Sequence, residues 1–204
     1  MLMKACSWTY SRTHLTMTLS NPLDPIYRAF AVASDCFKVA RRTLDKQDEK
    51  LIRRTQFVGA TRDEATTALT EAAKQASDLA ILALFATFER TVIEHLQTAN
   101  LLLIAGYPQE YSSALAEKFV KDVEYWKFDD ILDLFKGEVD ANLIGQVKQI
   151  KDYRDWIAHR NPRRATPSQA TPQIAFGVLT KVIEQIRTTH TRPVEAQDAP
   201  ALPQ

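Results

Sequence analysis

The sequence predicts an all-α protein, and three observations support this fold class. Only five of the 204 residues are glycine, and most segments are filled by strong helix formers such as Ala, Leu, Glu, Lys, Gln and Arg. Apolar residues recur at the spacing of three and four positions that places them on one face of a helix. No stretch of useful length shows the apolar–polar alternation of a β-strand.

The first predicted helix opens at Asn21 and Pro22, since proline is favoured in the first turn of a helix. Leu51 continues its apolar stripe, and the helix is expected to end near Gly59. The stripe itself steps by four and three positions through Ile26, Phe30, Ala33, Phe37, Ala40 and Leu44.

A second long helix is predicted from the capping box formed by Thr61 and Glu64 to about Leu103. Its middle, DLAILALFATFERTVIEHL, is apolar on nearly every side and should lie at the centre of the core. Glu89 lies within this stretch and needs a partner, either Arg154 across the core or Arg90 or another base. Two long helices joined by a short loop predict an N-terminal antiparallel helical hairpin.

The rest of the chain predicts four shorter helices and few other features. A helix over about 110–126 is expected to turn Leu115, Phe119 and Val123 inward. The others are FDDILDLF, ending at Gly137, a helix from about Glu138 to residue 159 or 160, and a last helix over about 173–189. Asp129, Asp130 and Asp133 suggest either a cation site or acids favoured by the helix dipole, and we prefer the dipole.

These elements predict three segments: a flexible N-terminal segment, 1–20, a single helical domain, 21–190, and a disordered tail, 191–204. The composition is that of a soluble globular protein, 45% hydrophobic and 25% charged. With a net charge of +1, any affinity for nucleic acid must come from a local patch.

The expected location is the cytoplasm. The first twenty residues lack the apolar run of a signal peptide, and no apolar stretch is long enough to predict a membrane span. Cys6 and Cys36 lie far apart in sequence and are interpreted as unpaired thiols of a reducing compartment.

Arg154 occupies a position where the helical spacing of apolar residues predicts another apolar residue. The stripe of its helix steps through Leu143, Val147, Ile150, Arg154 and Ile157. Burying a guanidinium on the apolar face of a helix lowers the stability of the fold by several kcal/mol unless the group is paired or opens onto a cleft. Arg154 can therefore pair with a buried acid such as Glu89, reach solvent along its aliphatic stem, or belong to a functional site.

The position of His159 favours the interpretation that Arg154 belongs to a functional site. On a continuous helix, residues five positions apart point about 140° away from each other. Pro162, however, disfavours helical geometry at Asn161, so the helix should end at about His159 or Arg160. The imidazole would then lie at a helix terminus, with Asp155 four positions earlier on the same face to orient the ring.

Positive charge gathers around this helix end, where four arginines fall within residues 154–164. Tyr153 and Trp156 add aromatic faces beside them. A basic patch with a positioned imidazole and nearby aromatic rings suits a polyanion with a scissile phosphate. The candidate RNA-contacting residues are Arg160, Asn161, Arg163 and Arg164.

The same groups suit RNA cleavage without a metal. The chain has no CxxC, HExxH, glycine-rich phosphate loop or GxSxG motif, so no metal and no cofactor are predicted. RNA supplies its own nucleophile, the 2′-hydroxyl, while an imidazole serves as base or acid and an arginine stabilises the phosphate. The products would be 2′,3′-cyclic phosphate and 5′-hydroxyl ends. A two-fold dimer would supply a second histidine.

The stretch RDWIAH, residues 154–159, resembles the R-x4-H signature of the HEPN superfamily, including the polar residue directly after the arginine. The helical pattern, with its long apolar central helix, resembles the family over roughly residues 22–190. The resemblance implies a HEPN-like bundle and a metal-independent endoribonuclease that acts as a homodimer, often as a toxin or defence effector with a nucleotidyltransferase-type antitoxin. It makes Arg154 the phosphate-stabilising residue, His159 the catalytic imidazole and Asp155 the polar residue that shapes the site.

Two other interpretations stay open. Some members of that superfamily are catalytically silent modules, which would bind a nucleotide, RNA or a protein partner. A coiled-coil scaffold built on the long hairpin would explain the first two helices but would leave Arg154 unexplained.

Overall fold

The structure of the chain is a computed structural model, which describes residues 20–46, 49–100, 104, 108–159, 165 and 167–190. Within these residues all regular elements are helices, and the one strand-like pairing is an isolated bridge between Lys136 and Val139. The all-α prediction is therefore confirmed. The predicted tail 191–204, and the predicted flexible segment 1–20 except for Ser20, lie outside the described residues.

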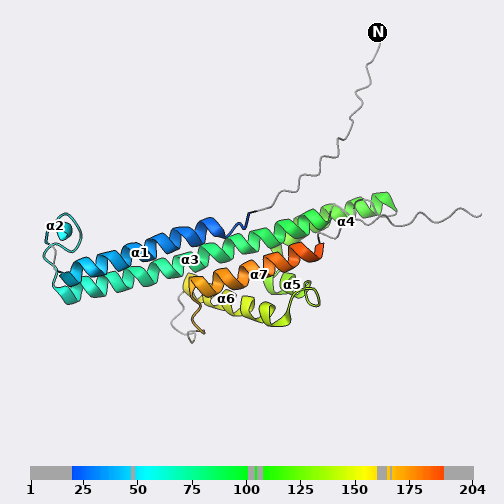
Figure 1. Cartoon of the computed structure of the whole chain (residues 1–204). Helices are drawn as coiled ribbons and strands as arrows, with labels where there is room; N and C mark the ends of the chain where they lie inside the picture. Colours follow the sequence, from blue (N-terminus) through cyan, green and yellow to red (C-terminus); the bar gives the residue numbers. More distant parts are fainter. Residues whose placement is uncertain are drawn as a thin grey trace, which may run out of the picture.

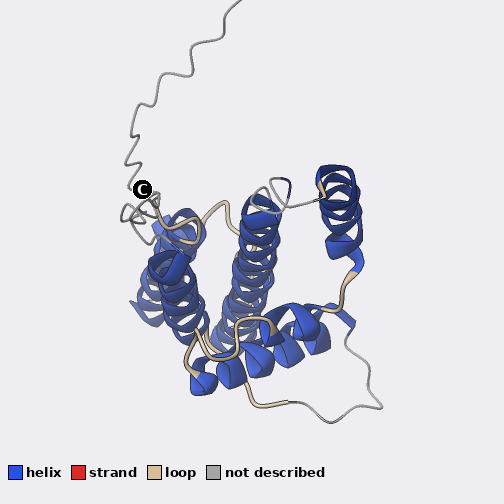
Figure 2. Ribbon diagram, turned by 90° about the vertical axis from the view of Figure 1, so that its right-hand side faces the viewer, coloured by secondary structure: helices blue, strands red, loops and turns tan. Residues whose placement is uncertain are grey.

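The helix α3 (Arg62–Ala99) is the long axis around which the other elements are arranged (Figure 1). The helix α1 (Asp24–Lys46) runs in the opposite direction along its N-terminal part, and α6 (Ala141–His159) and α7 (Pro172–His190) pack against its middle. Figure 2 shows the same helices after a turn of 90° about the vertical axis. The smaller elements are α2 (Glu49–Ile52), α4 (Gln109–Asp122), the 3₁₀ helix η2 (Val123–Tyr125) and α5 (Phe128–Asp133).

The predicted capping box starts α3. The Thr61 hydroxyl accepts a hydrogen bond from the Glu64 amide at 3.3 Å, and the Glu64 carboxylate accepts one from the Thr61 amide at 2.8 Å. These bonds satisfy two amides, one of them a free amide of the first helical turn, so the sequence signal for this helix start is confirmed.

The apolar middle of α3 forms the centre of the main core, as predicted. Phe85 and Phe88 are fully buried, and the ring of Phe128 from α5 meets both edge-on, with centroids 5.5 and 5.8 Å away. From α7, Leu179 and Val182 are also fully buried in this core. A second, smaller cluster lies between α1 and the start of α3 and consists of Leu44, Ala65 and Leu69.

The predicted length of the first helix is wrong. Helix α1 ends at Lys46 instead of continuing to Gly59, and Leu51 is 61% exposed instead of extending the stripe. Leu44 is the buried residue of α1, and the two residues that end the helix, Asp45 and Lys46, are polar and exposed. The chain reverses instead through a turn in which Arg54 and Gly59 have positive φ angles, 75° and 79°.

The predicted inward face of α4 differs from the structure at one position. Leu115 is 45% exposed, whereas its neighbour Ala116 is buried. The small side chain lets α4 approach the end of α3, where the amide of buried Asn100 donates a hydrogen bond to the Ala116 carbonyl at 2.8 Å. Phe119 and Val123 face the core as expected.

Candidate functional site

Helix α6 carries both residues of the Arg–His motif and is anchored by its apolar stripe. Val147, Ile150 and Ile157 are at most 5% exposed and pack in the main core. Because this stripe is held in the core, Arg154, which lies on the same face of α6, is directed towards α3. The helix ends at His159, as predicted from Pro162.

Arg154 is paired across the helix interface, as one of the interpretations of the sequence proposed. Its Nη2 donates to Glu89 Oε2 of α3 at 3.3 Å, and its Nη1 lies 3.0 Å from Asp155 Oδ1. The guanidinium carbon lies 4.6 Å from the centroid of the Phe85 ring, within the range of a cation–π contact. The side chain is 25% exposed, and its buried Nε has no hydrogen-bond partner.

These contacts belong to a chain of alternating charges. Lys151 Nζ lies 3.3 Å from Asp155 Oδ2 and 3.2 Å from Asp129 Oδ2, so two bases share three acids, Glu89 being the third. Burial raises the pKa of Glu89 and the charge of Asp155 adds to the rise, while the charge of Arg154 opposes it. Burial acts to lower the pKa of Lys151, but its hydrogen bond to Asp129 and the charge of Asp155 outweigh this and raise it.

His159 is exposed at the last position of α6. The sequence predicted that Asp155 would orient the His159 ring. Within the described part of the chain, no hydrogen bond joins the two side chains. The Asp155 carboxylate is instead engaged by Arg154 and Lys151, which offer it two positive charges.

The two motif residues leave α6 in different directions. Because the helix is continuous through His159, side chains five positions apart point about 140° away from each other. Arg154 faces α3, while His159 shares a face with Trp156, three positions earlier. Within one copy of the chain, the helix alone does not bring the guanidinium and the imidazole together.

The predicted RNA-contacting residues Arg160, Asn161, Arg163 and Arg164 lie outside the described residues and stay predictions. Asp129 and Asp133 of α5 take part in ion pairs, and Asp133 lies 2.8 Å from both Lys136 and Lys148. The described residues include no cluster of three or more His, Cys, Asp or Glu side chains arranged to hold a metal ion. In the same residues, no helix is long and apolar enough to cross a membrane.

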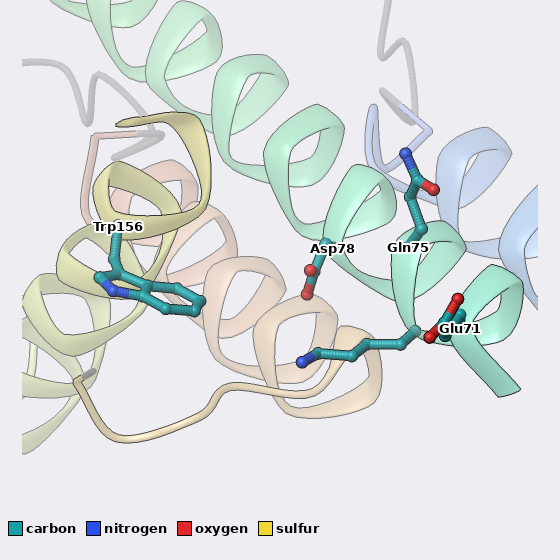
Figure 3. A pocket seen from close by; sticks show the side chains of 5 residues that line it. Glu71, Gln75, Asp78 and Trp156 are labelled. Atoms are coloured by element: carbon teal, nitrogen blue, oxygen red, sulfur yellow. The ribbon is translucent and has the colours of Figure 1, made fainter. Parts of the chain in front are cut away.

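The sequence analysis missed a pocket between α3 and α6 (Figure 3). Its volume is about 340 Å³, and Trp156 lines it opposite four polar residues of α3, namely Glu71, Lys74, Gln75 and Asp78. Asp78 is only 4% exposed and accepts a hydrogen bond from the hydroxyl of buried Tyr153 at 3.0 Å. The signal was present in the sequence: positions 71, 74, 75 and 78 follow the spacing of one helix face, and all four are polar.

Comparisons of the chain with protein-family models, with curated proteins and with solved structures give no match. The resemblance to the HEPN superfamily therefore depends on the motif and its helical setting.

Proposed function

We propose that this chain is a metal-independent endoribonuclease of the HEPN type, which cleaves RNA as a homodimer through Arg154 and His159. One observation carries the proposal. The last turns of α6 hold a guanidinium fixed by two carboxylates and, five positions later, an exposed imidazole. A toxin or defence effector restrained by a nucleotidyltransferase-type antitoxin is the biological setting in which such an activity would work.

Arg154 would stabilise the phosphate. Its guanidinium has five N–H donors, and the contacts to Glu89 and Asp155 use one on each terminal nitrogen. The second N–H of each terminal nitrogen is left for a phosphate oxygen. Glu89 and Asp155 would act as positioning residues, since a guanidinium held before the reaction needs no reorganisation when charge builds up on the phosphate.

His159 would move the protons. The 2′-oxygen of RNA attacks the phosphorus and the bond from phosphorus to the 5′-oxygen breaks, leaving a 2′,3′-cyclic phosphate. One neutral imidazole takes the proton of the 2′-hydroxyl, and one imidazolium gives a proton to the leaving 5′-oxygen. These two roles need two imidazoles. A two-fold dimer supplies them and can also set His159 of one copy beside Arg154 of the other.

The second candidate is a catalytically silent module that binds RNA, a nucleotide or a protein. A specific observation favours it: two carboxylates already neutralise Arg154, so a phosphate would have to compete with them. In this alternative the pair of Arg154 with Glu89 serves only to join α6 to α3, and the function lies in a binding surface.

The two candidates are separated by incubating the purified full-length chain with total cellular RNA in excess EDTA. We expect cleavage that leaves 2′,3′-cyclic phosphate ends, identified by mass spectrometry, and a dimer by light scattering. His159→Ala should lower the rate by about 100-fold or more at an unchanged melting temperature, because general acid–base groups contribute on that order and the side chain is exposed.

The matched control is Gln149→Ala, an exposed residue on the same helix, which should cleave like the wild type. Cleavage by His159→Ala at the wild-type rate would overturn the proposed site. Intact RNA after incubation with a folded, dimeric wild type would favour the binding module.

A further inference from the structure

Helix α1 carries a second apolar stripe besides the one that packs on α3. Its main members, Val32, Cys36 and Val39, are spaced by four and three positions, so they share one face of the helix. All three are exposed, Val32 at 65% and Val39 at 60%. An apolar helix face that stays open to water is typical of a surface that binds a partner.

Helix α3 has an exposed, uncharged face of the same kind. Ala68, Ala72 and Leu79 follow the helical spacing, and Leu79 is 58% exposed. The two alanines are exposed as well. Small side chains at a contact allow the axes of two helices to approach to about 8 Å, so this face suits packing against another helix.

The two faces lie on the same edge of the α1–α3 hairpin. The other edge is identified by the hydrogen bond that Arg41 donates to Thr70 at 2.8 Å. Residues two positions apart on a helix point about 160° away from each other, so Val39 lies opposite Arg41. For the same reason Ala68 and Ala72 lie opposite Thr70. We name this free side of the hairpin the apolar edge, which comprises Val32, Cys36, Val39, Ala68, Ala72 and Leu79.

The apolar edge is large enough for a contact between two copies of the chain. The hairpin extends past α6 and α7 towards its tip (Figure 1). The uncharged stripes run from Ala29 to Thr43 on α1 and from Ala68 to Ala86 on α3, lengths of about 21 and 27 Å. With a width of roughly 20 Å for two helices, one copy offers on the order of 500 Å². Two such faces bury on the order of 1,000 Å², the area that a specific interface needs.

We propose that the apolar edge is a dimer interface, on which a second copy packs its own α1 and α3 in the antiparallel direction to form a four-helix bundle. The stripe on α1 suits a two-fold axis near Cys36, because Val32 lies four residues before it and Val39 three residues after it. Val32 of one copy then meets Val39 of the other, and the two Cys36 side chains lie close together. A face that matches itself in this way is what an isologous interface requires.

The same axis brings the ends of the two α6 helices to one side of the bundle. Cys36 lies five residues before Arg41, so the bond from Arg41 to Thr70 places it level with about residue 75 of α3. Gln75 lines the pocket that Trp156 of α6 also lines. A two-fold axis that crosses the helices at this level keeps both α6 ends on the same flank.

This geometry places His159 of each copy near that of the other, since His159 lies one turn beyond Trp156. The use of the two imidazoles in catalysis rests on the proposed function, whereas the interface stands without it.

The first test is light scattering of the full-length chain over a dilution series. We expect a dimer, and Val32→Glu and Val39→Glu should each raise its dissociation constant at least about 100-fold, because each puts an unpaired charge into an apolar contact. Both side chains are exposed in a single copy, so the helical content by circular dichroism should not change. Val58→Glu is the matched control. Val58 is 61% exposed near the hairpin turn, away from the apolar edge, and its substitution should leave the dimer intact.

The second test is thiol cross-linking, with Cys6→Ser in every variant. A short bismaleimide linker should join two copies through Cys36, and Cys36→Ser should abolish the product. In that Cys36→Ser background, a mixture of Val32→Cys and Val39→Cys chains should cross-link, whereas neither variant should do so alone. Lys38→Cys is the matched control, because Lys38 lies on the other edge of α1 and should give no product.

A wild type that stays monomeric at every concentration tested, or a dimer that survives both glutamate substitutions, would overturn the inference. Efficient cross-linking by Val39→Cys alone would overturn the antiparallel arrangement. A dimer that passes both tests but leaves RNA intact would support the interface and contradict only the proposed ribonuclease. RNA cleavage by monomeric Val39→Glu at the wild-type rate would leave the interface assigned and contradict the pairing of the two His159 side chains.

Discussion

Arg154 Nη2 lies 3.3 Å from Glu89 Oε2 although 65 residues separate the two in sequence, and both side chains are less than one-third exposed. This pair joins α6 to the centre of α3 at the point where the candidate site is built. It makes the same arginine a structural contact and a candidate catalytic group, so the two roles have to be separated by experiment.

Arg154→Met should destabilise the fold by about 1–3 kcal/mol, because it leaves the Glu89 carboxylate partly buried without its counter-charge. Glu89→Met should lower the free energy of unfolding less in the Arg154→Met variant than in the wild type. The measurement is the free energy of unfolding in urea for both single variants and the double variant. Strictly additive costs would mean that the pair contributes no coupling energy.

Glu89→Gln should change the pH dependence of stability. The folded pKa of Glu89 is raised by burial, so the folded state binds more protons than the unfolded state between the two pKa values. The contribution of Glu89 is thus fully present below the unfolded pKa and is lost as the pH rises through the folded pKa. The difference in unfolding free energy, variant minus wild type, should rise as the pH increases from the unfolded pKa of a glutamate, about 4.3, and level off above the folded pKa. A flat difference over that range would contradict the raised pKa.

Tyr153→Phe should cost about 1–3 kcal/mol of stability, since it removes a donor from the buried carboxylate of Asp78. Tyr111→Phe is the matched control, because Tyr111 is 66% exposed and should tolerate the change. Thermal unfolding of both variants beside the wild type tests the prediction. Equal melting temperatures would mean that the buried carboxylate does not need the Tyr153 hydroxyl.

Arg54→Gly should stabilise the protein by up to about 1 kcal/mol, because Arg54 adopts a φ of 75°, where a side chain is strained and glycine is not. The same change at its neighbour Arg53, which has no such φ, should be neutral or destabilising. Urea unfolding of the two variants distinguishes them. Destabilisation by Arg54→Gly that matches that of Arg53→Gly would show that the turn holds no strain.

Local signals in the sequence predicted much of the helical pattern. The capping box of Thr61, the stop at His159 before Pro162 and the apolar middle of α3 each depend on a few neighbouring residues, and the structure has all three. The end of α1 was missed because periodicity shows which face would be buried but not where the partner surface stops. Leu51 fits the period and is nevertheless exposed.

The candidate site was predictable only in part. The seam position of Arg154 was visible in the spacing, and Glu89 was named as one partner, but Lys151 and Asp129 were not, since their contacts depend on how α5 packs beside α6. The pocket at Asp78 needed the same tertiary information. A polar face on α3 is visible in the sequence, while the aromatic wall of Trp156 that faces it comes from another helix.

The separation of the two apolar clusters along α3 has a consequence for its motions. The small cluster of Leu44, Ala65 and Leu69 holds only the tip of α1 against the first turns of α3, whereas Phe85 and Phe88 lie in the large core. Backbone amides near residue 65 should therefore exchange with deuterium through a local opening that leaves the large core closed. The stretch from Glu71 to Asp78 lies between the two clusters, so we expect its amides to exchange more slowly than those near residue 65 and faster than those beside Phe85 and Phe88.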